Sequence, residues 1–182
     1  IAVDSDFETS EPGVYAIGDV AARTQLAHVA AAQGTYVVEK IAGRAHSVKL
    51  EVVPNGMFVS LPIVPNCIYT DPEIATVGIT EERAKQGGLK VRCGHFSMRD
   101  NGKSIITGEE HGFIRLLFEA YSNTIVGAQM MCPRATDMIG EIATAIANGL
   151  TAQEMSFAMR AQPTYNEGIG AAIEDAMRQN PV

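Results

Sequence analysis

An amide, a rigid proline ring and a carboxylate lie close together at Gln162, Pro163 and Glu167, between two helical patterns. Pro163 has no N–H and disfavours the helical conformation at Gln162, so the preceding helix must end and the backbone there is extended. Thr164 and Glu167 have the spacing of a capping box, in which each side chain bonds the other residue's N–H. Residue types alone favour this capping role for Glu167 over a catalytic one.

Asp19 is a second candidate, because it follows the short apolar run Val14–Ile17. Such a run is typical of a parallel strand covered on both faces, and a further strand is predicted at Ile1–Asp4. Ligands of open α/β sheets gather at the carboxyl ends of strands, where an aspartate can accept hydrogen bonds from the hydroxyls of a sugar or sugar alcohol. The alternative is a turn or helix cap by Asp19, which residue types alone favour.

A helix is predicted from Gln25 to about Ala42, with Gly43 as its stop. One of its faces carries small residues that would let a planar ligand or another backbone come close: Ala27, Ala30, Ala31 and Gly34. Tight internal packing is equally compatible with this pattern. Neither Gly-x-Gly-x-x-Gly nor a phosphate-binding glycine loop occurs, so the chain alone is not expected to hold a dinucleotide.

The three cysteines are predicted to be free thiols, because they are far apart and odd in number. They are Cys67, Cys93 and Cys132. Cys93 and His95 would share one face of a strand, which is the only hint of a metal ligand pair. With no second such pair, ordinary packing is favoured and no metal site is predicted.

Composition is that of a globular protein, with 182 residues, 46% hydrophobic and 19% charged. The net charge of −7 and the pI near 5.1 argue against a nucleic-acid partner. No apolar run approaches the roughly 18 residues of a transmembrane helix, and no secretory or lipidation signal opens the chain. The predictions are no membrane partner and a cytoplasmic location.

The residues after the aperiodic, proline-containing stretch from Arg44 to Pro62 alternate between strand and helix patterns. Strands are predicted at 67–69, 74–77, 90–98, 112–118 and 124–130, the last two as a hairpin turned at 121–123. Helices are predicted at 80–86, at 136–148, from 151 through Met155 and Met159 to before Pro163, and from Thr164 onward. The apolar faces of the two longer ones are Met138, Ile139, Ile142, Ala143 and Ile146, and Tyr165, Ile169, Ala172, Ile173 and Ala176. The methionines are predicted to be packing residues.

The stretch QPTYNE at 162–167 resembles the His-Pro-Thr-x-x-Glu signature of the pyridine nucleotide-disulfide oxidoreductases. The resemblance implies that Gln162 stands at the position of a histidine that moves a proton to and from a thiol. It also implies that Glu167 matches the glutamate that orients that imidazole. Glutamine keeps the hydrogen-bonding reach but has no titration near neutral pH, so it cannot be a general acid or base.

The segment TSEPGVYAIGD at 9–19 resembles the second flavin motif of the same family, and LAHVAAAQG at 26–34 resembles the helix that follows it. The resemblance implies that Asp19 holds the ribityl chain of FAD and that the backbone N–H of Ala27 faces the flavin ring. The family usually has a glutamate where this chain has Gln33. The match raises the functional interpretation of Asp19 above its capping alternative.

The segment from Val64 to Gly78 resembles the opening of the family's dimerisation domain. Cys132–Asp137 also resembles the family, which commonly has a glycine at the Cys132 position and a glutamate at the Asp137 position. The expected fold class is α+β, a mostly antiparallel sheet with flanking helices, preceded by the last strand and helix of an α/β FAD-binding domain. The expected domains are the FAD-domain remnant at 1–45, a connection at 46–61 and the dimerisation domain at 62–182. The resemblance covers the last third of a full enzyme, without its nucleotide-binding glycine motifs or redox disulfide.

The resemblance implies a parent enzyme that passes electrons between a dithiol and NAD through a disulfide and FAD. Within the family, the sequence most resembles the members that oxidise dihydrolipoamide. Mercuric reductase or glutathione reductase is the alternative within the family. FAD and NAD would serve the parent, and neither is expected to bind this chain alone. The implied partner is a second copy, in a homodimer where the acid/base residue of one subunit completes the other's site. A lipoyl-bearing protein is a candidate partner, and a dimerising module without catalysis is the alternative from another class.

Overall fold

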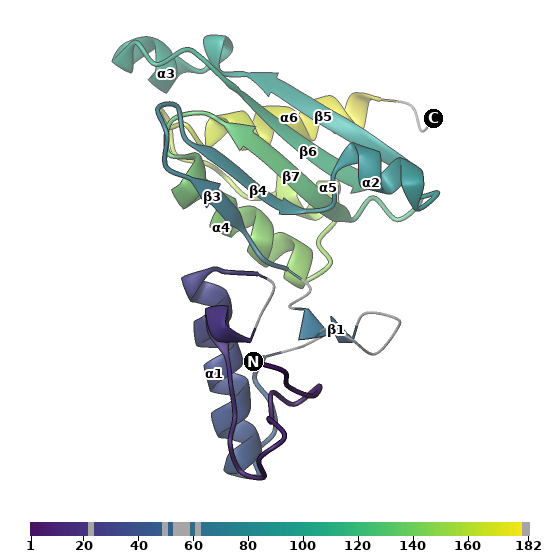
Figure 1. Ribbon diagram of the computed structural model, residues 1–182. Helices are drawn as coiled ribbons and strands as arrows, with labels where there is room; N and C mark the ends of the chain where they lie inside the picture. Colours follow the sequence, from purple (N-terminus) through teal and green to yellow (C-terminus); the bar gives the residue numbers. More distant parts are fainter. Residues whose placement is uncertain (22–23, 49–50, 53–58, 61–62, 180–182) are drawn as a thin grey trace. The chain divides into compact units, whose positions relative to one another are not determined.

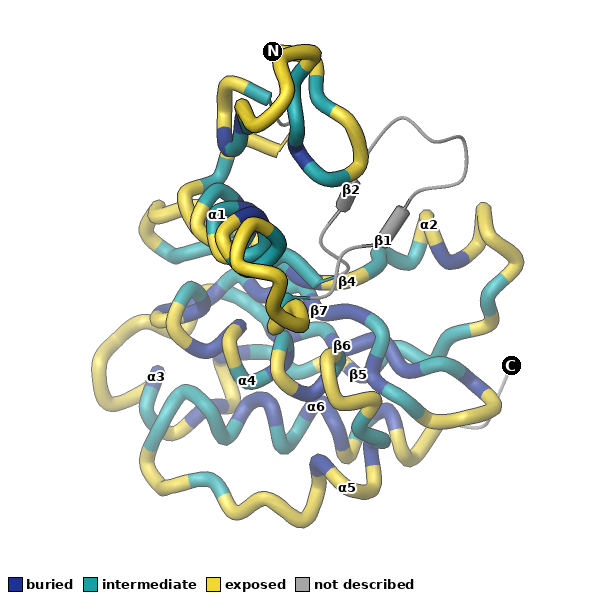
Figure 2. The backbone as a smooth tube through the Cα atoms, turned by 90° about the horizontal axis from the view of Figure 1, so that it is seen from below, coloured by how far each residue is buried: buried dark blue, intermediate teal, exposed yellow. Residues whose placement is uncertain are grey.

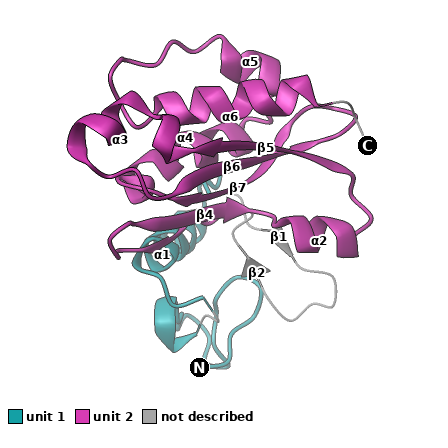
Figure 3. Cartoon of the chain, turned by 90° about the horizontal axis from the view of Figure 1, so that it is seen from above, with its two compact units in different colours: residues 1–62 teal, residues 63–182 magenta. Residues whose placement is uncertain are grey.

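The structure is a computed structural model that describes residues 1–21, 24–48, 51–52, 59–60 and 63–179. The chain divides into two compact units, Ile1–Pro62 and Ile63–Val182, which Figure 3 colours separately. None of the helices in the described ranges is both long and apolar enough to cross a bilayer.

Unit 1 is built on helix α1 (Ala27–Ile41), which follows the short 3₁₀ turn η1 (Gly18–Val20) (Figure 1). The predicted helix and its stop are confirmed, because Gly43 has a φ of +63°, a left-handed conformation that glycine adopts without strain. Two short strands, β1 (Glu51–Val52) and β2 (Val59–Ser60), pair antiparallel within the predicted connection. Strands of this length leave no period in the sequence, and the rest of that stretch lies partly outside the described residues.

The two strands predicted before α1 are wrong. Neither Ile1–Asp4 nor Val14–Ile17 forms a strand, and Tyr15 makes only an isolated antiparallel bridge to Glu8. A parallel strand covered on both faces is stable only inside a sheet. The described residues of unit 1 before α1 contain no strand that could pair with it, so the apolar run folds back on the preceding residues instead.

Unit 2 is organised around a five-stranded sheet with the order β3-β4-β7-β6-β5, in which every neighbouring pair is antiparallel (Figure 1). The strands are β3 (Asn66–Ile68), β4 (Ile74–Gly78), β5 (Val91–Ser97), β6 (Phe113–Glu119) and β7 (Ile125–Met131). The predicted strands of this region and the hairpin are confirmed, and so is the α+β class.

Helices α4 (Ala135–Ala147) and α6 (Glu167–Arg178) cover one face of this sheet, α4 against β4 and β7 and α6 against β5 and β6. Figure 2 shows much of α6 and the central strands as buried. The predicted apolar faces are confirmed, and they form one core with the inward side chains of the strands. Its fully buried members include Met98, Ile114, Leu116, Phe118, Met130, Ile142, Ile169 and Ile173.

Shorter elements connect these layers: α2 (Glu81–Gln86), η2 (Met98–Asp100), α3 (Gly102–Thr107) and α5 (Ala152–Ser156). The capping box that opens α5 is confirmed, because Thr151 and Glu154 each bond the other's backbone N–H. The predicted length of α5 is wrong. Met155 and Met159 share one face only while a helix continues, and α5 ends at Ser156, so Met159 is 99% exposed and does not pack.

Candidate functional site

The candidate site lies on the segment between α5 and α6, residues 157–166, which we call the strap. The strap has no helix or strand, and Gln162 and Pro163 are exposed on it. The peptide bond between these two residues is cis. The helix α5 ends at Ser156, well before Pro163, and the strap leads directly into the first residue of α6.

Glu167 opens α6, but the capping box predicted with Thr164 is only half formed. The Thr164 N–H donates to Glu167 Oε2 at 2.8 Å, as predicted. The Thr164 hydroxyl instead donates to the carbonyl of Ala161 at 2.6 Å, and the helix N-cap is Asn166. The turn around Pro163 explains the difference, because it brings the Ala161 carbonyl within reach of the hydroxyl before the helix begins.

Gln162 and Glu167, the two predicted catalytic residues, are not hydrogen-bonded to each other. The Gln162 side chain makes no hydrogen bond to any part of the chain that the structure describes, and one Glu167 oxygen is engaged by the Thr164 N–H. Gln162 can donate or accept a hydrogen bond from its exposed position, but its amide cannot take up a proton near neutral pH. The Glu167 carboxylate shapes the backbone on which Gln162 lies.

Asn101, just before α3, and Glu109, just after it, hold the strap from one side. Neither residue was identified in the sequence analysis. Asn101 is 2% exposed, and its Nδ2 donates to the Thr164 carbonyl at 3.0 Å while its Oδ1 caps α3. The Tyr165 hydroxyl donates to Glu109 Oε2 at 2.5 Å. An Asn-Gly pair before a helical stretch signals a cap, but nothing local signals a bond to a residue 63 positions away.

The environment of Tyr165 makes it a poor substitute for the acid/base group that Gln162 lacks. Burial and the hydrogen bond to Glu109 raise the pKa of the Tyr165 hydroxyl above its usual value, so it stays protonated at neutral pH. The same bond lowers the pKa of the Glu109 carboxyl. Both groups are therefore committed to holding the strap.

From the other side, Glu141 of α4 contacts the strap on both sides of Gln162, at Arg160 and Asn166. Arg160 Nη2 donates to Glu141 Oε1 at 2.5 Å, and the Arg160 side chain is only 10% exposed. Asn166 Nδ2 lies 3.3 Å from Glu141 Oε2. One carboxylate thus bridges two residues that flank Gln162 in the sequence.

The candidate cofactor residues Asp19 and Ala27 lie in unit 1. Asp19 is exposed on η1 and makes no hydrogen bond or ion pair to another described residue. The turn is fixed from beneath, because the Gly18 N–H donates to the buried Gln33 Oε1 at 2.8 Å. Gln33 therefore positions the predicted site residue without touching solvent.

The small residues of α1 were compatible with either close approach of a ligand or tight internal packing, and the structure separates them into two groups. A Cβ built on Gly18 would lie 3.0 Å from the Ala30 Cβ, and one on Gly34 would lie 3.2 Å from the Ile17 side chain. Ala30 and Gly34 therefore serve tight internal packing. Ala27 and Ala31 remain exposed on the helix.

The three cysteines are free, which confirms the prediction. Cys93 and His95 do share one face of β5, opposite Gly94, and His95 is exposed beside the Phe113 ring. Burial raises the pKa of the Cys93 thiol, so this thiol is not activated. Within the described part of the chain, no group of three or more histidine, cysteine, aspartate or glutamate side chains could hold a metal ion.

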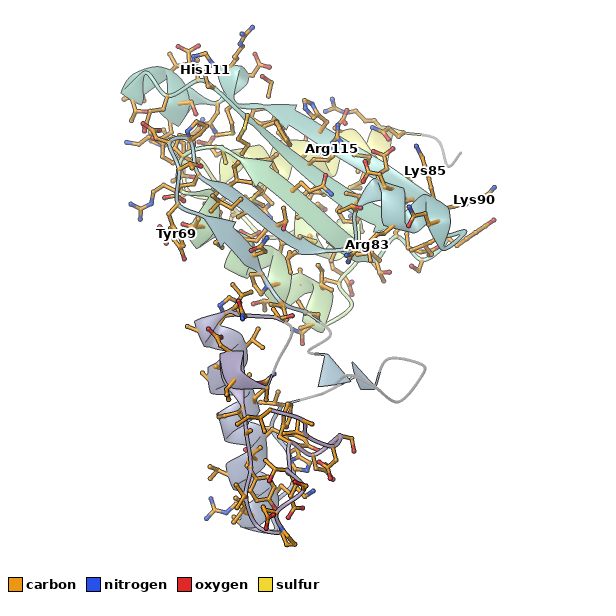
Figure 4. The ribbon with its side chains drawn as sticks, viewed as in Figure 1. Tyr69, Arg83, Lys85, Lys90, His111 and Arg115 are labelled. Atoms are coloured by element: carbon orange, nitrogen blue, oxygen red, sulfur yellow. The ribbon has the colours of Figure 1, made fainter. Side chains whose placement is uncertain are left out.

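Basic side chains near α2 are interleaved with acidic ones. Arg115 of β6 and Lys85 of α2 each lie 3.7 Å from a Glu81 oxygen. Figure 4 shows Arg115 beside α2, with Lys85 and Lys90 around the end of this helix. The absence of a nucleic-acid partner stays a prediction, and so does a cytoplasmic location.

Two family models match this chain. The model described as "Pyridine nucleotide-disulphide oxidoreductase, dimerisation domain" matches residues 64–173, and the one described as "Pyridine nucleotide-disulphide oxidoreductase" matches residues 1–34. The strap and the opening of α6 lie inside the first match, and η1 with the first half of α1 lies inside the second.

Curated relatives match over nearly the whole chain. The dihydrolipoyl dehydrogenase of Chlorobaculum tepidum is 35% identical over 98% of this chain and 36% of its own length. The enzyme of the same name from Bacillus subtilis is 38% identical over 94% of this chain and 34% of its own length. The chain therefore spans about a third of the length of these relatives.

Solved structures share the fold. LpdA from Mycobacterium tuberculosis is 27% identical, with a TM-score of 0.81 over 97% of this chain and 36% of its own. The HOCl-induced flavoprotein disulfide reductase RclA of Escherichia coli matches with a TM-score of 0.76 over 96% of this chain and 37% of its own. At 17% identity, RclA shows similarity of fold alone.

Proposed function

Because this chain belongs to the pyridine nucleotide-disulphide oxidoreductase family, we propose that it is the dimerisation portion of an enzyme that passes electrons between a dithiol and NAD through a disulfide and FAD. The observation that carries the proposal is the stretch from Gln162 to Glu167, with Gln162 and Pro163 exposed, which resembles the family signature except for Gln162 and lies within the matched dimerisation domain. The curated relatives named dihydrolipoyl dehydrogenase support dihydrolipoamide as the dithiol. The proposal includes a lipoyl-bearing protein as the source of that dithiol.

The test is a steady-state assay of the full-length enzyme that carries this chain, with dihydrolipoamide and NAD as substrates. Glutathione disulfide with NADPH and Hg²⁺ with NADPH test the two alternatives within the family. Turnover with dihydrolipoamide well above the other two supports the proposal. Turnover only with glutathione disulfide or Hg²⁺ would contradict dihydrolipoamide as the substrate, but it would remain consistent with membership of the family.

FAD fits the residues that unit 1 presents. The exposed Asp19 carboxylate is free to accept hydrogen bonds from ribityl hydroxyls, and the small, exposed Ala27 at the start of α1 leaves its backbone open to a planar ring. When bound, FAD supplies the electron transfer between disulfide and nicotinamide. Gln33 and Gly18 of this chain hold the turn that presents Asp19.

We predict that the isolated 182-residue chain binds neither FAD nor NAD measurably. Asp19 offers one polar contact, and the sequence has no glycine-rich loop to bind a pyrophosphate. Titration calorimetry with each nucleotide measures the affinity. Micromolar FAD binding would show that the flavin site is more self-contained than proposed.

The dimer belongs to the same proposal. The strap exposes Phe157, Met159 and Gln162, a surface suited to reach a second subunit rather than the core of its own. We predict that light scattering of the 19.4-kDa chain at micromolar concentration gives about twice that mass. A monomer across that range contradicts the dimer for this portion.

A dimerising module without catalysis is the second candidate, and Gln162 is the observation that favours it. An amide at this position removes proton transfer but leaves the hydrogen-bonding surface intact. Flavin colour in the purified full-length protein, together with NADH-dependent bleaching of that colour, decides between the two. A colourless, folded dimer would support the module.

A further inference from the structure

The strap lies between two hollows and therefore has little packing beneath it. One hollow of about 640 Å³ lies toward α4 and α5 and is lined by Leu150 and Met155 among others. Another of about 410 Å³ lies toward α6 and is lined by Phe96 and Gly170 among others. Ala158 and Arg160 of the strap line both hollows. Around Arg160, polar contacts rather than apolar packing set the position of the strap, whereas Tyr165 at its C-terminal end packs against the core.

Among those contacts, Glu141 has a special place because it holds the strap on both sides of Gln162. Arg160 precedes Gln162 and donates to Oε1, while Asn166 follows it and donates to Oε2. Arg160 also donates to the Ala158 carbonyl, so its guanidinium ties the beginning of the strap to α4. The helix α4 is itself anchored in the core through Ile139 and Ile142.

The Arg160 guanidinium depends on Glu141 for compensation of its charge. The Arg160 side chain is nine-tenths buried and its Nε has no hydrogen-bond partner in the described chain, so Glu141 is the group that compensates its charge. A buried cation that loses its partner is driven toward water. Without the Glu141 carboxylate, the guanidinium would turn outward and take the strap with it.

We propose that Glu141 is a positioning residue that sets the place of Gln162 on the strap, acting through Arg160 and Asn166. Glu141 touches neither Gln162 nor a reacting atom. It fixes the residues on both sides of Gln162, while Asn101 and Tyr165 fix the C-terminal half of the strap. The activity part of this inference rests on the proposed function, and the structural part does not.

The structural test is limited trypsin digestion of the 182-residue chain, with cleavage rates followed by mass spectrometry. Cleavage after Arg160 reports release of the strap, and cleavage after Arg115, in the interior strand β6, reports global unfolding. In Glu141→Gln we expect cleavage after Arg160 to accelerate about tenfold, since a hydrogen bond to a charged group contributes at least this much to a local opening equilibrium. Cleavage after Arg115 should not change.

The matched control is Asp137→Asn, which removes a carboxylate from the same helix. Asp137 pairs with Arg134 at 2.8 Å, but both side chains are more than half exposed, at 64% and 67%, and Asp137 has no hydrogen bond or ion pair to a described residue of the strap. This variant should leave cleavage after Arg160 unchanged. Acceleration in Asp137→Asn equal to that in Glu141→Gln would overturn the inference.

The functional test uses the full-length enzyme in rapid mixing, with flavin reduction by dihydrolipoamide and by NADH measured separately. In the Gln162→His background, where an imidazole at this position can take up the proton, Glu141→Gln should slow the dithiol reaction by about 10- to 100-fold, because small misplacements of a reacting group carry costs of this size. Reduction by NADH should be unchanged. A purely structural role would slow both reactions together or lower the flavin content.

The inference fails if cleavage after Arg160 does not accelerate, or if it rises in step with cleavage after Arg115. It also fails if both half-reactions fall equally or if neither changes. An unsubstituted enzyme that does not react with dihydrolipoamide contradicts the proposed function instead. In that case the trypsin result still decides whether Glu141 places the strap.

Discussion

Replacing Gln162 by histidine should raise dihydrolipoamide turnover of the full-length enzyme by about 10²- to 10⁴-fold, the range that a positioned acid/base group contributes. The position is exposed on the strap, and the Gln162 side chain has no hydrogen bond in the described structure to lose. The measurement is kcat for dihydrolipoamide oxidation in both forms. Electron flow from NADH to the flavin involves no proton transfer from a thiol and should change much less.

The turnover of Gln162→His should also depend on pH in a defined direction. An imidazole must be neutral to take a proton from a dithiol, so turnover of Gln162→His should rise with pH through the histidine pKa, near 6.5 in the absence of perturbation. A nearby Glu167 carboxylate favours the charged imidazole and would shift this rise to higher pH. The glutamine form should lack this limb of the profile.

Met159→His is the matched control for Gln162→His. It adds an imidazole to the same strap at a side chain that is 99% exposed, without placing it at the family's histidine position. Its turnover should equal that of the unsubstituted enzyme. Equal gains in the two variants, or an unsubstituted enzyme already as fast as Gln162→His, would remove the functional content of the match to the family signature.

Gly94→Ala should strongly destabilise unit 2, because β5 touches the backbone of α6 at this residue. A Cβ on Gly94 would lie 2.0 Å from the Ala172 carbonyl oxygen and 2.8 Å from the Ala176 Cβ. Overpacking of this kind costs about 1–3 kcal/mol, and a rigid helix backbone places the cost at the upper end. Urea unfolding followed by circular dichroism measures it, since the chain has no tryptophan.

Gly140→Ala makes the same chemical change with the opposite expected sign. Gly140 lies within α4, and no heavy atom lies within 4 Å of a Cβ built on it. Alanine in a helix interior is favoured over glycine by about 0.5–1 kcal/mol, so the urea midpoint should rise. A fall in both variants would show that the added methyl group is not what destabilises Gly94→Ala.

Much of unit 2 could be predicted from the sequence because its patterns are local and periodic. The β6–β7 hairpin and the apolar faces of α4 and α6 follow from residues two, three and four positions apart, which share a face whatever lies around them. The stop at Gly43 and the cap at Thr151 depend on neighbouring backbone alone. The match to a family also depended on contiguous segments.

The failures lie where a local pattern needed a distant partner. The run Val14–Ile17 has the composition of a buried strand, but it forms none without a neighbouring parallel strand. Met159 continues the helical spacing of Met155, but the helix ends first. In both cases the sequence has the local pattern of the predicted element. The element does not form there because the neighbouring strand or the continuing helix is absent from the described residues.

The sequence by itself determined the fold class, the core faces and the residues that could carry chemistry, because side-chain type and spacing suffice for these. Only the tertiary structure decided what holds Gln162 in place. Asn101 reaches Thr164 across 63 residues, and Glu141 reaches Asn166 across 25. Such contacts exist only after α4 and the residues around α3 have taken their places against the sheet, so no local pattern encodes them.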